Sequence, residues 1–96
     1  MAALGLDPAS VFKTLVVALD GGPLVVAIVP VGARLNLEAL AGALGGKRAL
    51  PTAIDASALA HPTIHVSTGR RGLELALVPA DLVRLTRATV APLTAQ

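Results

Sequence analysis

Val11-Phe12-Lys13-Thr14-Leu15-Val16-Val17 is a run of β-branched and aliphatic residues that contains a single lysine, and this composition predicts a β-strand. Side chains alternate between the two faces of a strand, so Lys13 shares a face with Val11, Leu15 and Val17. An ammonium group on an apolar face is costly unless it reaches water, pairs with an anion or loses its proton. Lys13 is therefore either a strand-end lysine that extends to the surface, or a lysine at a pocket for an anionic or carbonyl substrate.

The composition predicts one small domain. The chain has 96 residues, of which 54% are hydrophobic, enough for a single core. The apolar residues are almost all Ala, Val and Leu, and Phe12 is the only aromatic residue. A core of such small side chains suits a tightly curled sheet with helices packed against it.

The charge and cysteine content limit the classes of function. The absence of cysteine excludes disulfides, thiolate ligands and a cysteine nucleophile, and it is compatible with a reducing cytoplasm. The longest apolar run, residues 24–31, is too short to cross a bilayer, and no secretion signal is expected. A net charge of +2 permits a polyanionic partner without requiring one.

Turn and capping signals divide the chain into strands and helices. Asp20-Gly21-Gly22-Pro23 predicts a hairpin between a strand over residues 11–19 and a central strand over 24–30. Asn36 is expected to cap a helix over residues 37–44. The buried stripe of this helix is expected to contain Leu37, Leu40, Ala41 and Leu44.

The remaining elements are expected to be short. Residues 1–5 resemble the end of a helix, and Asp7 to Ser10 fit a single helical turn. The pattern predicts strands over residues 50–55, 61–67, 73–77 and 89–91, with a turn over 56–59. The last helix should run from Val78 to about Thr86, with Leu82 and Leu85 facing inward.

His61 and His65 invite a metal-site interpretation. On one strand they would share a face but lie roughly 13 Å apart, at about 3.3 Å per residue. They cannot hold one metal ion as a strand pair, and no other ligands converge in the sequence, so no metal is expected. His61 is expected in an exposed loop and His65 on a strand face.

The segment Ser67-Thr68-Gly69-Arg70-Arg71-Gly72 could hold a phosphate, because its glycines free backbone amides and its arginines supply charge. The alternative is an ordinary hairpin turn with solvated arginines, which the sequence alone favours. No serine lies in a Gly-x-Ser-x-Gly elbow, and no dinucleotide or nucleoside-triphosphate glycine loop is present. Base stacking requires aromatic side chains, and Phe12 alone makes no platform, so RNA contacts should involve backbone phosphates and a terminal ribose.

Several segments follow one another in a recognisable order: residues 4–8 (Leu-Gly-Leu-Asp-Pro), 11–16 (Val-Phe-Lys-Thr-Leu-Val), 47–49 (Lys-Arg-Ala), 50–55 (Leu-Pro-Thr-Ala-Ile-Asp) and 63–74. They resemble the YbaK/EbsC family of free-standing aminoacyl-tRNA deacylases, which are related to the editing domain inserted in bacterial prolyl-tRNA synthetase. The resemblance covers essentially the whole chain. Its most specific features are the Phe-Lys-Thr strand and the Ser-x-Gly-x-Arg-Gly loop together.

The resemblance implies an α+β fold, with a curled, mixed and mostly antiparallel sheet that forms a partly open barrel flanked by helices. It implies hydrolysis of cysteine mischarged onto proline tRNA, in the cytoplasm and without a cofactor, with the thiol of the substrate as the attacking group. Lys13 matches the family's required lysine. The substrate-binding residues would be Ser67, Thr68, Gly69, Arg70, Arg71, Gly72 and Glu74. The partners would be the acceptor end of the aminoacyl-tRNA and, as a further expectation, prolyl-tRNA synthetase.

One departure from the family pattern concerns the centre of the chain. The family has a Gly-x-x-x-Pro loop before the Leu-Pro-Thr strand, whereas here Ala49 runs directly into Leu50. A leading helix and strand before Met1 are also missing. We expect residues 1–96 to form a single editing domain. We also expect that the missing family residues belong to the protein but are left out of this sequence. A true deletion at Ala49–Leu50 should leave the domain inactive.

Three further hypotheses remain open at this stage. The same fold could act on alanine or serine attached to tRNA. The chain could also be a catalytically inactive tRNA-binding module, or a partial domain without activity. Deacylation assays with tRNAs that carry different amino acids distinguish an alanine or serine deacylase from a cysteine-specific enzyme. Binding of tRNA without deacylation would identify an inactive tRNA-binding module.

Overall fold

The computed structural model describes residues 8–18, 24–44, 51–67 and 74–95, and the structural statements below concern these residues. In chain order the elements are η2 (Pro8–Ser10), β1 (Val11–Ala18), β2 (Leu24–Pro30), β3 (Arg34–Leu35), α1 (Leu37–Leu44), β4 (Thr52–Asp55), η3 (Ala56–Ala60), β5 (Ile64–Ser67), β6 (Glu74–Leu77), α2 (Pro79–Thr86), β7 (Thr89–Ala91) and β8 (Thr94–Ala95).

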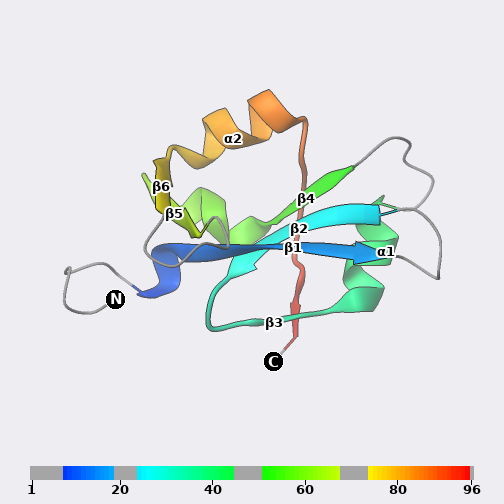
Figure 1. Ribbon diagram of the computed structural model, residues 1–96. Helices are drawn as coiled ribbons and strands as arrows, with labels where there is room; N and C mark the ends of the chain where they lie inside the picture. Colours follow the sequence, from blue (N-terminus) through cyan, green and yellow to red (C-terminus); the bar gives the residue numbers. More distant parts are fainter. Residues whose placement is uncertain (1–7, 19–23, 45–50, 68–73, 96) are drawn as a thin grey trace.

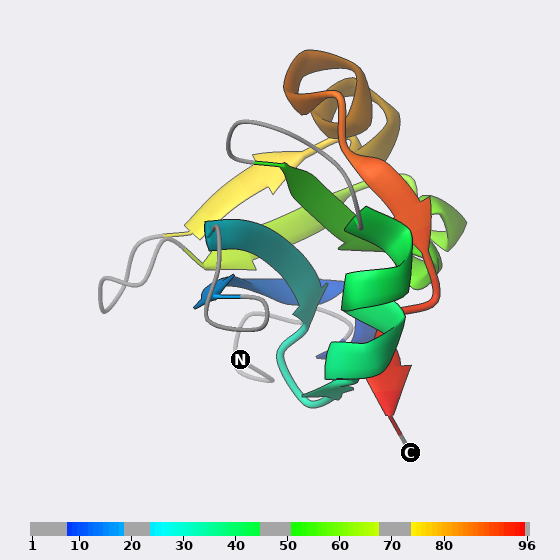
Figure 2. The same ribbon diagram turned by 90° about the vertical axis from the view of Figure 1, so that its right-hand side faces the viewer.

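The main sheet has six strands in the order β6-β5-β1-β2-β4-β7, and β3 pairs separately with β8. The antiparallel β1–β2 hairpin is the longest pairing, with seven residue pairs, and β5–β6 adds four more antiparallel pairs. The pairings β1–β5, β2–β4 and β4–β7 are parallel and have three residue pairs each. Most of the paired residues are thus antiparallel, and the predicted α+β fold with a curled mixed sheet is confirmed (Figures 1 and 2).

Each face of the sheet carries its own apolar cluster. On one face, here called the α1 face, Val25, Ala27 and Val29 of β2 pack with Leu40 and Leu44 of α1. On the opposite face, the α2 face, Phe12, Ile28 and Ile54 pack with η3 and α2. Figure 1 shows the two helices on opposite sides of the sheet. The continuous apolar sequence of β2 follows from this arrangement, because both of its faces are covered, and its prediction as a central strand is confirmed.

Two leucines expected in the core are exposed, so these predictions are wrong. Leu37 is 57% exposed and Leu85 is 78% exposed. Leu37 lies in the first turn of α1, whereas the buried contacts of that helix come from Leu40 and Leu44. In α2 the side chains that pack on the sheet are Leu82 and Val83. A helix of two turns can present only a narrow stripe to one sheet, so the outer leucines find no partner.

Several element boundaries differ from the predictions. Residues 56–60 form a 3₁₀ helix rather than a simple turn, and residues 61–63 precede β5 instead of belonging to it. Strand β4 begins at Thr52, after Pro51, because proline cannot donate to the sheet. The predicted turn at residues 20–23 and the helix at 1–5 lie outside the described residues. In the part of the chain that the structure describes, no helix is long and apolar enough to span a membrane.

The predicted cap of α1 is confirmed. The side-chain oxygen Oδ1 of Asn36 accepts a hydrogen bond from the backbone N–H of Ala39 at 3.1 Å, which satisfies one of the free donors at the helix start. The cap fixes where α1 begins, and the backbone N–H of Asn36 also donates to the carbonyl of Leu93 at 2.7 Å. The start of α1 is therefore attached to the C-terminal segment that covers the same face.

The residue after α2 provides a stability prediction. Arg87 has a φ of 55° and caps the helix in the left-handed conformation, which favours glycine because a Cβ atom is strained there. We expect Arg87→Gly to raise the free energy of unfolding by up to about 1 kcal/mol. Urea denaturation of both proteins measures this difference. A lower stability for the glycine variant would show that the Arg87 side chain contributes more than its backbone conformation costs.

Candidate functional site

Lys13 lies on the α1 face, as its position in the strand predicted. In the β1–β2 hairpin it pairs with Val29, while Leu15 pairs with Ala27 and Val17 with Val25. These β2 partners all belong to the apolar cluster under α1. Lys13 itself is half-buried. Its aliphatic stem thus continues an apolar row, and its amine must find polar contacts at the end of that row.

The amine of Lys13 is held by the turn that follows β2. Its Nζ atom donates a hydrogen bond to the carbonyl oxygen of Ala33 at 3.1 Å. Backbone bonds fix this turn, from Ala33 N to Pro30 O at 3.0 Å and from Val31 N to Val11 O at 2.8 Å. An ammonium group has three donors, so this contact orients the amine and leaves two donors for other acceptors.

Ser67 occupies the register position next to Lys13, and Glu74 occupies the position beyond Ser67. Strand β5 runs parallel to β1 with Ser67 opposite Lys13, and β6 runs antiparallel to β5 with Glu74 opposite Ser67. The three residues form one lateral row across three strands, at about 4.8 Å per strand. We call this the Lys13 row. The structure thus brings together three predicted site residues from two distant segments of the sequence.

The remaining predicted site residues belong to the connection between β5 and β6. Thr68, Gly69, Arg70, Arg71 and Gly72 lie outside the described residues. The ends of this connection are Ser67 and Glu74, both of them in the Lys13 row. The proposed phosphate-binding role of the two arginines remains a prediction.

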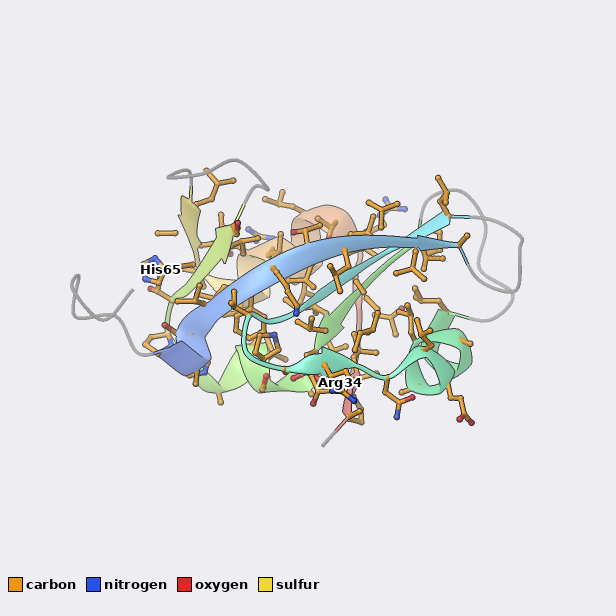
Figure 3. The ribbon with its side chains drawn as sticks, turned by 60° about the horizontal axis from the view of Figure 1, so that its bottom comes forward. Arg34 and His65 are labelled. Carbon is orange, nitrogen blue, oxygen red and sulfur yellow. The ribbon has the colours of Figure 1, made fainter. Side chains whose placement is uncertain are left out.

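The α1 face is divided into an apolar and a polar part. Helix α1 packs on the part formed by β2, β4 and the second half of β1. Lys13, His65 and Ser67 are half-buried and belong to neither apolar cluster. Figure 3 views the molecule from this side, with α1 and β3 in front of the sheet. The polar part of the face is the candidate functional site.

Two residues that sequence reasoning did not assign to a site lie on opposite sides of β1 (Figure 3). Arg34 is exposed on β3, directly after the Ala33 carbonyl that holds Lys13. The sequence carried no signal for it, because a two-residue strand has no detectable periodicity. His65 lies on β5, opposite Val11 of β1 and two positions before Ser67. The sequence predicts His65 as a strand-face residue, and no motif in the sequence assigns it to a site.

The two histidines lie on different segments of the described chain. His61 follows η3 and is not part of β5. No group of three or more His, Cys, Asp or Glu side chains that could hold a metal ion occurs among the described residues.

Comparison with solved structures identifies the class of fold. A crystal structure of "a putative trans-editing enzyme for prolyl tRNA synthetase" matches with a TM-score of 0.82 and 21% identity, over 99% of this chain and 76% of the other. The hypothetical protein APE2540 matches with a TM-score of 0.82 and 24% identity, over 98% and 80% of the two chains. The fold is therefore that of the trans-editing domains. No protein-family model matches the sequence.

A relative in sequence shows the family. The "Putative Cys-tRNA(Pro)/Cys-tRNA(Cys) deacylase EbsC" of Enterococcus faecalis is 30% identical, over 96% of this chain and 73% of its own length. The chain belongs to the YbaK/EbsC family.

The same comparison bears on the length of the chain. The alignment spans 120 residues, whereas this chain has 96 in total, so the relative contains at least 24 residues without a counterpart here. The Ala49–Leu50 junction lies outside the described residues. It remains a prediction that the missing family residues belong at this junction. It also remains a prediction that they are omitted from the sequence rather than deleted from the protein.

Proposed function

We propose that this protein is a trans-editing hydrolase that removes cysteine from mischarged proline tRNA. The observation that carries the proposal is the Lys13 row, in which the hydrogen-bonded Lys13 lies next to Ser67 and Glu74 follows in register on the next strand. Ester hydrolysis at the end of a tRNA needs a cation near the terminal phosphate or ribose, and groups that orient the aminoacyl moiety. The family relationship supports the same reaction.

In the proposed reaction the substrate supplies the nucleophile. The thiolate of the cysteinyl group attacks its own ester carbonyl, a carbon–sulfur bond forms, and the bond from that carbon to the ribose oxygen breaks. The ribose oxygen takes up a proton, and the cysteine leaves as a cyclic thiolactone. Lys13, with one donor held by Ala33 O, offers its other donors to the terminal phosphate or ribose. The chain itself has no cysteine, so it contributes orientation, charge and exclusion of larger aminoacyl groups.

The test is deacylation of proline tRNA carrying cysteine, alanine, serine or proline. We expect cysteine to be released fastest and proline to be released at the rate of the reaction without protein. A matched substrate with S-methylcysteine should resist the protein, since its sulfur cannot attack. Faster release of alanine or serine would replace the cysteine assignment with an alanine or serine deacylase. Binding of all four tRNAs without any release would identify an inactive tRNA-binding module.

The basic loop leads to a second measurement on the same reaction. If Arg70 and Arg71 contact phosphates of the acceptor end, replacing both with alanine weakens tRNA binding for every aminoacyl group alike. The slope of log affinity against log salt concentration should fall by about 1.4, since each single-strand phosphate contact contributes about 0.7. Arg84→Ala is the matched control, because Arg84 lies on α2, across the sheet from Lys13. An unchanged slope in the double variant would exclude these arginines from the interface.

The choice of proline tRNA remains a separate part of the proposal. The described part of this face offers three predicted site residues, Lys13, Ser67 and Glu74, and the proposal assigns all of them to the acceptor end of the tRNA. We propose that prolyl-tRNA synthetase contributes this selection as a partner. Adding the synthetase to the deacylation assay should increase the preference for proline tRNA over other cysteinyl-tRNAs.

A further inference from the structure

The aromatic rings of this chain are few, and their positions differ sharply. The sequence contains one Phe, two His and no Tyr or Trp. Phe12 is fully buried, with 0% exposure, on the α2 face. His61 follows η3, whose Ala58 also packs in the cluster of the α2 face. Among the described residues of the main sheet, His65 is therefore the single aromatic ring on the same face as Lys13.

The register determines how His65 lies relative to the Lys13 row. His65 is opposite Val11 on β1, and Ser67 is opposite Lys13, so His65 and Lys13 are diagonal neighbours on one face. A strand spacing of about 4.8 Å and a rise of about 3.3 Å per residue place their Cα atoms about 8 Å apart. The neighbours of His65 on β5, Ile64 and Val66, point into the opposite cluster, which confirms that His65 faces the site.

The amine of Lys13 and the ring of His65 belong to different neighbours of β1. Lys13 Nζ donates to Ala33 O in the turn that follows β2, whereas His65 lies on β5, the strand on the other side of β1. Figure 3 shows the labelled His65 on the side of β1 opposite to Arg34, which directly follows Ala33. A terminal nucleotide bound with its ester or phosphate at Lys13 would direct its base along the same face toward the half-buried ring of His65.

We propose that His65 is the stacking platform for the terminal adenine of the tRNA acceptor end. The inference rests on the proposed function for its substrate, and it adds the base contact that the sequence alone did not suggest. Single-stranded nucleotides bind proteins largely through stacking of bases on flat side chains, including histidine. Among the described residues of the main sheet, His65 is the one aromatic ring on the polar part of the α1 face. His65 is thus a substrate-binding residue and takes no part in the chemical step.

The direct test measures binding of adenosine 5′-monophosphate to the full chain by NMR titration, with ribose 5-phosphate as the ligand that lacks a base. We expect His65→Ala to raise the dissociation constant for the nucleotide roughly fivefold or more, and His65→Phe to restore it. Binding of ribose 5-phosphate should be equal in all three proteins. His61→Ala is the matched control and should bind the nucleotide like the wild type.

The results separate this inference from the proposed function, because nucleotide binding requires no reaction. The stacking proposal is contradicted if His65→Ala binds the nucleotide with wild-type affinity, or if His65→Phe binds it as weakly as His65→Ala. It is also contradicted if the wild type shows no binding at millimolar nucleotide. If the nucleotide binds through His65 but no aminoacyl-tRNA is hydrolysed, the base contact stands and the deacylase assignment fails. With an active wild type, His65→Ala should raise KM for Cys-tRNA(Pro) at least fivefold and leave kcat within about twofold.

Discussion

Replacing Lys13 with alanine should lower kcat/KM for deacylation of Cys-tRNA(Pro) by about 10² to 10³, the effect of losing one preorganised charged donor. The reason is specific to this site. The amine is already oriented by the carbonyl of Ala33 at 3.1 Å, so it contributes charge to the substrate without further reorganisation. The loss should be seen in single-turnover assays at saturating protein, which separate chemistry from tRNA binding.

The controls for this prediction use the other charged residues of the chain. Lys13→Arg keeps the charge but changes the donor geometry, and we expect it to recover only part of the activity. Arg84→Ala removes one positive charge from the exposed face of α2, where Arg84 pairs with Asp81 at 3.1 Å, and it should retain full activity. Thermal unfolding should change little in all three variants, because the half-buried Lys13 belongs to neither apolar cluster and Arg84 is exposed. Wild-type activity in Lys13→Ala would remove Lys13 from the mechanism.

Replacing Asp55 with alanine should cost about 3 to 4 kcal/mol in the free energy of unfolding. Asp55 is 4% exposed, and its Oδ1 atom accepts a hydrogen bond from the buried N–H of Leu93 at 2.7 Å. Its Oδ2 atom accepts from the backbone N–H of Ser57 at 3.2 Å and from the Ser57 hydroxyl. Without the carboxylate, the buried N–H of Leu93 loses its acceptor.

Urea and thermal denaturation would measure this effect. A loss of this size corresponds to a fall in Tm of roughly 15 °C or more for a domain of about this length. Asp55→Asn should lose about half as much, since the amide oxygen can still accept from Leu93. Asp81→Ala is the matched control, because its carboxylate is exposed, and it should cost less than about 1 kcal/mol. If Asp55→Ala is as stable as Asp81→Ala, the C-terminal segment is held by its apolar contacts alone.

The sequence determined the local structure where neighbouring residues carry the signal. The β1–β2 hairpin joins two apolar runs across a turn motif, and its pairing required no knowledge of the rest of the chain. The start of α1 followed from Asn36, since a capping side chain bonds within three residues. Lys13 and the face it shares with Leu15 and Val17 followed from strand alternation alone.

Sequence patterns failed where burial depends on a distant element. Leu85 has the helical spacing of a core residue, but it is exposed because α2 reaches the sheet through Leu82 and Val83. The two-residue strands β3 and β8 exist only because they pair with each other, from distant parts of the chain. The role of Asp55 was equally hidden, since its partner Leu93 lies 38 positions later.

The residue types of the candidate site could thus be predicted from the sequence, because each residue lies in a local motif or in a segment that resembles the family. Their assembly was decided by the tertiary structure. Lys13 and Ser67 become neighbours through a parallel pairing of β1 with β5, and no turn between them can specify that register. The register is set by burial, because a shift of one residue would turn the apolar side chains of β5 away from the α2 face. The same constraint places His65 and Lys13 on one face.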